Sequence, residues 1–404
     1  MEIKHFGPID EARIIFDRYT VLIGKQGSVK STVAKLYSLF TWLEKSLIRG
    51  MLSAKYITQY SRFQKNYCKY HRIDGYFKTD TFIFFDGIHY RFLFDDGKLS
   101  IEEKNIEEEI KVSKVMYVPA ERNFLSTVDS TSALGELPPA LQTFLIEFDK
   151  AKLFYKSGYD IPIDGMRFKY DALNKIPYIE GSDHKVRLSE SSSGFQSVLP
   201  MLLVSSFLAS LVSANNDFND LSHEDVLKIH SEVEKIMNDE SLSDEVKFAM
   251  ARNISAKFSY YNFVNIVEEM EQNLYPESQK DVLFELLHYT NENKNNRLLL
   301  TTHSPYIISY LTIAVKAWQL DEKISSRDGS EIDNYRENLG KILPSESMID
   351  GRHLKIYEMG GGTASLLNTY NGMPSDENVL NYHLGLTNEM FDQLFEIEEE
   401  WDNA

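Results

Sequence analysis

Cysteine, a signal peptide and long apolar runs are scarce or lacking in this sequence, and each absence excludes a class of protein. Cys68 is the only cysteine, so no disulfide can form within the chain, which suits a reducing compartment. The first ten residues, MEIKHFGPID, lack the pattern of a signal peptide, and we find no run of about 18 apolar residues. We therefore expect a soluble cytoplasmic protein without a membrane partner.

Basic side chains are fewer than acidic ones, 43 against 61, and the net charge is −18. Such a chain repels nucleic acid on average, so contact with a polyanion needs a local basic patch. Residues 45–72 form one, because they contain no acid and seven basic side chains: Lys45, Arg49, Lys55, Arg62, Lys65, Lys69 and Arg72. Aromatic residues are interleaved with them. Two interpretations stay open: a helical insertion over 37–78 whose rings pack inward, or a surface for nucleic acid or an acidic protein.

The stretch VLIGKQGSVKSTVAKL, residues 21–36, is close to a phosphate-binding loop, which reads Gly, four residues, Gly, Lys and Ser or Thr. An apolar stretch precedes it and a helix-like stretch follows, so backbone N–H groups would receive the phosphates of ATP. Lys30 would reach the β- and γ-phosphates, and the Ser31 hydroxyl would bind Mg²⁺. The predicted nucleotide-binding residues of this loop are Gly24, Lys25, Gln26, Gly27, Ser28, Val29, Lys30, Ser31 and Thr32.

Val29 stands where the phosphate-loop pattern has its second glycine. If the loop needs positive φ there, a β-branched residue would cost about 1–3 kcal/mol in strain or would displace Lys30. Three interpretations stay open: an inactivating change, a natural loop with slow turnover, or a site that binds ATP without hydrolysing it. We favour impaired hydrolysis with a retained fold.

Two further apolar stretches end in polar side chains that suit phosphoryl transfer. NFVNIVEEMEQNLYP runs into Glu268, a candidate Mg²⁺ ligand, and Glu269, a candidate general base for water. The alternative is a pair of surface glutamates in an acidic protein. LLLTTHSPYII places His303 at a strand end, 34 residues after Glu269, with room for one helix between them. Neighbouring strands would let His303 touch the γ-phosphate, whereas a lone histidine is more often structural.

The stretch RLSESSSGFQSVLP opens a long apolar helix over 194–212, and serines at a helix start can bind an anion. This signal is weak alone, because serine caps are common. Strands alternate with helices along the chain, an antiparallel meander is predicted over 81–103, and a polar helical lobe over 213–258. The MGGGTASLL stretch, 359–367, is predicted to be a turn. We expect an α/β fold with a mostly parallel sheet.

The order of these four segments resembles the ABC-type ATPases of the SMC and OLD (overcoming-lysogenisation-defect) group, and most closely the compact bacterial ATPases of anti-phage systems. That group has IEEPE-x-x-L-x-P after the acidic strand, and VEEMEQNLYP matches it at Glu268, Glu269, Glu271, Leu274 and Pro276. IKHFGPIDEARI and YVPAERNFLS are also similar to the group. The resemblance spans roughly residues 1–40, 114–126, 188–212 and 262–312, and implies one ABC-type P-loop ATPase domain over 1–404.

The resemblance also implies partners and further roles. Ser192, Ser193 and Gly194 would cap the γ-phosphate bound by a second subunit, so that ATP sits at a head-to-tail dimer interface. Because the chain shows no nuclease or zinc pattern, its effector would be a separate protein, typically a nuclease. Two alternatives remain: a non-hydrolysing, ATP-stabilised scaffold, or an SMC-like DNA repair ATPase, against which the lack of a long heptad repeat argues. The glutamine-loop residue is open, with Glu121 and Asn123 as neighbours.

Overall fold

The computed structural model describes residues 1–27, 29–105, 110–127, 136–213, 223–239, 259–326 and 332–402, together with the single positions 247, 250, 254 and 257. Most of the predicted acidic lobe at 213–258 lies outside the described residues. The longest described part of it is helix α5 (His223–Met237). Ser28 of the predicted phosphate loop also lies outside them.

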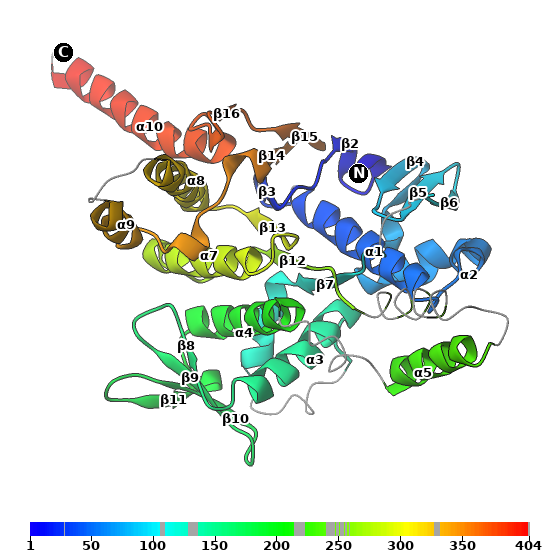
Figure 1. The fold of residues 1–404 in the computed structure, drawn as a ribbon. Helices are drawn as coiled ribbons and strands as arrows, with labels where there is room; N and C mark the ends of the chain where they lie inside the picture. The colour runs from blue at the N-terminus through cyan, green and yellow to red at the C-terminus, as the bar shows by residue number, and fades with distance from the viewer. Residues whose placement is uncertain are drawn as a thin grey trace.

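One large sheet of eleven strands organises the chain, in the order β6-β5-β4-β1-β2-β15-β14-β3-β13-β12-β7 (Figure 1). Its second half is parallel, because each neighbouring pair from β14 through β3, β13 and β12 to β7 is parallel. The bounds are β3 Tyr19–Ile23, β7 Ser113–Val118, β12 Asn262–Glu268, β13 Arg297–Thr302 and β14 Leu354–Gly360. The carboxyl ends of these strands therefore meet at one edge.

The other half of the sheet is mainly antiparallel, so the sheet is mixed: the α/β class is confirmed, but the parallel part is smaller than expected. The predicted meander over 81–103 is confirmed in β4, β5 and β6, which pair antiparallel. A hairpin of β1 and β2 pairs with it, and β15 closes the gap to the parallel half. The bounds are β1 Glu2–Phe6, β2 Ile9–Arg13, β4 Phe77–Asp86, β5 Tyr90–Asp95, β6 Lys98–Glu103 and β15 Thr363–Leu366.

Helices cover both faces of the parallel half, and two apolar cores result. Side chains alternate along a strand, so Val21 and Ile23 of β3 lie in one core while Leu22 between them lies in the other. The first core includes α3 (Pro139–Phe154), α4 (Ser193–Ser213), α7 (Pro276–Asn291) and α8 (Pro305–Ser325). The second includes α1 (Lys30–Ile48) and the antiparallel strands.

The buried helix predicted over 194–212 is confirmed as α4. By length and composition α4 is apolar enough to cross a membrane, but 78% of its apolar window is buried inside the protein. It packs against α3 and α7, as a core helix does. The turn predicted at 359–367 is confirmed only at Gly361 and Gly362, which have φ of +55° and +78°; most of the remaining stretch lies in β14 and β15, which it joins.

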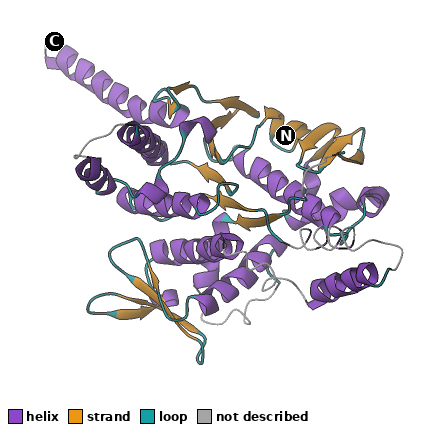
Figure 2. Ribbon diagram, in the orientation of Figure 1, coloured by secondary structure: helices purple, strands orange, loops and turns teal. Residues whose placement is uncertain are grey.

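A small antiparallel sheet, set apart from the main one, was not predicted (Figure 2). Its strands are short: β8 Tyr159–Asp160, β9 Arg167–Asp171, β10 Ile176–Glu180 and β11 Lys185–Arg187. The remaining described elements include the short pair β16 (Thr369–Tyr370) and β17 (Met373–Pro374), and the helices α9 (Ile332–Gly340) and α10 (Val379–Asp402).

The first part of the predicted insertion at 37–78 continues helix α1 without a break up to Ile48. Beyond it follow α2 (Ala54–Thr58), a 3-10 turn and a π-helical turn (Phe63–Cys68). The aromatic rings divide between core and surface: Phe63 is buried against Phe40, with ring centroids 5.6 Å apart, whereas Tyr60 is 79% exposed. Inward packing thus accounts for only part of the aromatic pattern.

Candidate active site

The loop between β3 and α1 places Lys30 at the carboxyl edge of the parallel strands. Its ammonium group donates to Gly24 O at 2.7 Å and to Lys25 O at 2.9 Å, and lies 3.3 Å from His303 Nδ1. Burial lowers the pKa of Lys30 to about 8, against a smaller opposite effect of nearby glutamates. This contact joins the phosphate loop, which follows β3, to the end of the neighbouring strand β13.

Val29 does not strain this loop, so that expectation is wrong. Its φ is −68° and its ψ is 0°, values that need no glycine. The side chain is 2% exposed and packs in the core on the α1 side of the sheet. Glycine is required instead at Gly24, whose φ is +143° and where a Cβ would collide with the carbonyl of Met359.

Glu268 ends strand β12 with its side chain buried. Burial raises the pKa of its carboxyl group, and interactions with Tyr117 and Ser31 oppose this rise. Within the part of the chain that the structure describes, Glu268 Oε1 has no hydrogen-bond partner. A buried carboxylate oxygen without a partner, beside a serine hydroxyl, is a donor set that Mg²⁺ accepts. Among the described residues no group of three His, Cys, Asp or Glu side chains forms a metal cluster by itself.

Glu269 and His303 lie side by side, as the sequence predicts for the ends of neighbouring strands. β12 and β13 pair in parallel, with α7 between them in the chain, and His303 Nε2 is 3.3 Å from Glu269 Oε1. Lysine can only donate, so its contact with Nδ1 leaves the ring proton on Nε2, which donates to Glu269. This hydrogen bond is the largest influence on Glu269 and holds the pKa of its carboxyl group below the usual range.

The backbone around these side chains is held tightly. Glu269 has φ +44°, an uncommon conformation for a residue with a side chain, and such strain is concentrated at functional sites. Its N–H donates to Thr301 on β13. The N–H of His303 donates to Glu271 Oε1 at 2.6 Å, so a third glutamate fixes the histidine.

Arg122 is a site residue that sequence reasoning missed. Its side chain is fully buried, and burial lowers its pKa to about 10. The guanidinium donates to Glu268 O at 2.6 Å, Glu269 O at 2.8 Å, Ser197 O at 3.0 Å and Pro119 O at 3.3 Å. It thereby joins the end of β12 to the first turn of α4. The signal in the sequence was the arginine within YVPAER, between Glu121 and Asn123.

The Ser-Gly segment lies at the start of α4, which begins at Ser193. Ser192 and Ser193 are exposed. A Cβ at Gly194 would lie 3.0 Å from Asn273 O, and Ser197 Oγ donates to Gln272 at 3.3 Å. The segment thus packs on the loop that follows Glu269, while its serines face outward. Their role toward a second subunit stays a prediction.

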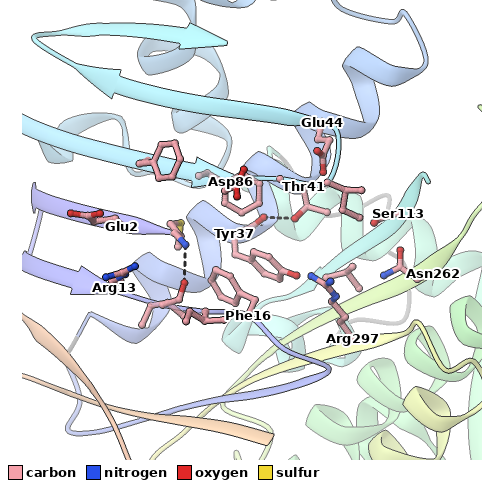
Figure 3. Close-up of a pocket in the computed structure, with 18 residues that line it drawn as sticks. Glu2, Arg13, Phe16, Tyr37, Thr41, Glu44, Asp86, Ser113, Asn262 and Arg297 are labelled. Carbon is pink, nitrogen blue, oxygen red and sulfur yellow. Dashed lines mark hydrogen bonds between the residues drawn. The ribbon is translucent and has the colours of Figure 1, made fainter. Parts of the chain in front are cut away.

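A separate pocket of about 440 Å³ lies at the opposite edge of the sheet (Figure 3). Ser113, Asn262 and Arg297, which line it, are at or next to the starts of β7, β12 and β13, far along each strand from the residues above. Figure 3 shows the Tyr37 hydroxyl directed toward the Arg297 guanidinium. None of the predicted site residues lines this pocket.

Comparison with known proteins gives a likeness in fold only. No family model and no curated protein matches the chain. The chain is similar to an SMC head domain from Thermotoga maritima, with 10% identity, a TM-score of 0.35 and coverage of 91% of this chain and 97% of that one. It is also similar to a Smc head domain bound to the C-terminal domain of ScpA, from Pyrococcus furiosus, with 10% identity, a TM-score of 0.34 and coverage of 96% of this chain and 98% of that one. A third similar structure is the recombination mediator RecF, with 8% identity, a TM-score of 0.27 and coverage of 91% and 97%. With each of these TM-scores below 0.5, this likeness adds no argument to the geometry.

Proposed function

We propose that this chain is an ABC-type P-loop ATPase that binds and hydrolyses MgATP. One observation carries the proposal: Lys30, His303 and Glu269 come from three separate segments and form a continuous chain of contacts, each 3.3 Å long. Glu268 ends strand β12 beside them, and one oxygen of its carboxylate has no hydrogen-bond partner within the described residues. A lysine, a metal-binding acid and a general base at one sheet edge are the parts that phosphoryl transfer requires.

The loop and its neighbours would hold the nucleotide. Backbone N–H groups of the phosphate loop and the ammonium group of Lys30 bind the phosphates, while Ser31 and Glu268 hold Mg²⁺. The metal ion, when bound, offsets the negative charge that develops on the transferred phosphoryl group. Arg122 keeps the backbone carbonyls of both glutamates in place, which fixes the two carboxylates relative to the loop.

Glu269 acts as the general base. The hydrogen bond from His303 lowers the pKa of its carboxyl group, so the group is ionised at neutral pH and can accept a proton from water. His303 positions this carboxylate and, through its other ring nitrogen, links it to Lys30. We also propose that His303 contacts the γ-phosphate of bound ATP.

The wider role follows the family resemblance. We propose that Ser192, Ser193 and Gly194 complete the site of a second subunit, and that the resulting oligomer senses for, or restrains, a separate effector, typically a nuclease, in bacterial anti-phage defence. The outward exposure of both serines supports the composite site. The neighbouring gene, if it encodes a nuclease, supports the defence role.

The test is release of phosphate from MgATP by the wild-type chain and by Lys30→Ala. We expect hydrolysis by the wild type and its loss, with weakened ATP binding, in Lys30→Ala. Lys98→Ala is the control, because Lys98 is exposed on β6, the edge strand of the antiparallel half of the sheet, and belongs to no part of the proposed site. A wild type that binds ATP without turnover would favour the scaffold alternative, and one that binds no ATP would overturn the proposal.

A further inference from the structure

The C-terminal helix α10 projects from the body (Figure 1), and many of its apolar side chains are exposed. From Thr387 to Asp402 every residue is exposed. Met390, Leu394, Ile397 and Trp401 recur at intervals of four, three and four residues, so they form one stripe along the helix. Their exposed fractions are 62–80%, with Trp401 the highest. A stripe of this kind on an unpartnered helix marks an interaction surface.

The charge of α10 decides what can cover this stripe. The helix carries seven acidic side chains and no lysine or arginine: Glu389, Asp392, Glu396, Glu398, Glu399, Glu400 and Asp402. Two copies of α10 would repel each other along such a contact, because like charges oppose close approach. The partner surface must therefore combine apolar or aromatic groups with basic ones.

The same chain has such a surface at the basic segment 45–72. An apolar pocket of about 370 Å³ is lined by rings from this segment and from α1, among them Tyr67, Tyr70 and Trp42. Lys65 and Lys69, both exposed, stand next in sequence to lining residues Asn66 and Tyr70. No acidic residue interrupts the segment.

One polar atom in the pocket wall also lacks a partner. His71 is 97% buried, and its Nδ1 has no hydrogen-bond partner within the described residues. Burial lowers the pKa of His71 to about 3, so the ring is neutral and has one nitrogen that accepts. The indole N–H of tryptophan is a donor only, and therefore complements an accepting nitrogen of a histidine that lines an aromatic pocket.

We propose that α10 of one molecule docks on the basic segment of a second copy, with Trp401 entering the pocket formed by Trp42, Tyr67 and Tyr70. The α10 and α2 regions lie on opposite sides of one molecule, so a chain does not reach its own segment (Figure 1). The contact is head to tail and gives a ring or a filament. It uses no residue of the phosphate loop, although the pocket wall includes Tyr117, which interacts with Glu268, and we expect it to form without ATP.

Sedimentation velocity on the full chain in a Lys30→Ala background, without nucleotide, tests this contact separately from any ATP-driven dimer. We expect self-association that weakens as salt is raised. Trp401→Ala should weaken it roughly tenfold or more, because a central tryptophan dominates such contacts. The double change Lys65→Glu and Lys69→Glu should do the same by reversing the rim charge.

Mixing the two defective proteins is the decisive step. Trp401→Ala retains an unchanged pocket, and the lysine double variant retains an unchanged α10. The α10 of the lysine variant can therefore bind the pocket of Trp401→Ala, so the mixture should form a one-to-one heterodimer that neither protein forms alone. Tyr370→Ala and Lys98→Glu with Lys294→Glu are controls, since these side chains are also exposed, and they should assemble like the parent. A monomeric parent, unchanged assembly of Trp401→Ala, or a mixture without heterodimer overturns the proposal.

Discussion

His303 Nε2 lies 3.3 Å from Glu269 Oε1, and this one contact joins the ends of two neighbouring parallel strands. It sets the protonation of the proposed base, since the histidine is the first cause of the lowered pKa of Glu269. The folded-state pKa is depressed, so the pair stabilises the fold above the ordinary value of 4.5. That contribution is lost as pH falls through the lower folded value.

Removing the histidine should therefore shift the acid limb of the pH–rate profile. In His303→Ala, the pKa of Glu269 returns toward its ordinary value, and hydrolysis should begin to fall at a higher pH than in the wild type. Steady-state rates across the acidic range measure this. His288→Ala is the control, because His288 lies on the surface of α7 away from the site. An unmoved acid limb in His303→Ala would show that another group sets it.

Lys30 should impose an alkaline limit on ATP binding. Its pKa is lowered to about 8, so the free protein loses this positive charge above that pH. The dissociation constant for ATP should then rise, approaching roughly tenfold per pH unit. Titrations from neutral to alkaline pH measure it, with Lys30→Arg as the control whose guanidinium stays charged. Equal pH dependence in both proteins would contradict the assignment.

Val29→Gly should destabilise the protein and should not raise the rate of ATP hydrolysis. The valine has an unstrained φ and is buried, so the change removes apolar contacts and adds backbone freedom. The expected loss in the free energy of unfolding is roughly 2–4 kcal/mol. Urea denaturation measures it, and Val29→Ala separates lost packing from backbone freedom. Faster hydrolysis by Val29→Gly would restore the strain interpretation rejected above.

Arg122→Lys should lower stability and disturb hydrolysis more than ATP binding. A lysine keeps the charge but cannot reach four carbonyl oxygens at once, so buried acceptors lose their partners. The cost is roughly 3 kcal/mol, measured by urea denaturation, and kcat should fall while the affinity for ATP changes little. Arg91→Lys, at an exposed position, should be nearly neutral. An unchanged melting curve for Arg122→Lys would refute this role.

Much of the site was predictable because its residues follow the ends of strands, and strand ends can be read from the sequence. Apolar runs that stop at polar residues identified β12 and β13, and the single helix between Glu269 and His303 placed their ends together. Contacts between side chains and backbone groups that are far apart in the sequence were not predictable in this way. Arg122 lies in a 3-10 helix (Ala120–Ser126), and its four acceptors belong to segments up to 147 residues away, which no periodic pattern encodes.

Each of the other wrong or missing predictions can be traced to one feature of the sequence. The sheet was expected to be mostly parallel because strands alternate with helices along the chain, whereas the β1–β2 hairpin and the antiparallel pairing of β15 with β14 enlarge the antiparallel half. The small sheet of β8 to β11 has strands of two to five residues, too short for an alternating pattern. Val29 was misjudged because a family pattern fixes the residue type at a position, while only the backbone shows whether φ is positive there.

The central claim, that Glu269 is the base of a MgATP-hydrolysing site, is tested most directly by Glu269→Gln. The amide keeps the shape of the side chain but cannot accept the proton, so ATP should bind while phosphate release falls by roughly 100-fold or more. Trapped ATP should then stabilise a dimer or larger assembly, seen by light scattering with ATP and Mg²⁺. Glu277→Gln, exposed on α7, is the control and should hydrolyse like the wild type. Wild-type turnover in Glu269→Gln, or monomers only with ATP in both proteins, would contradict the account.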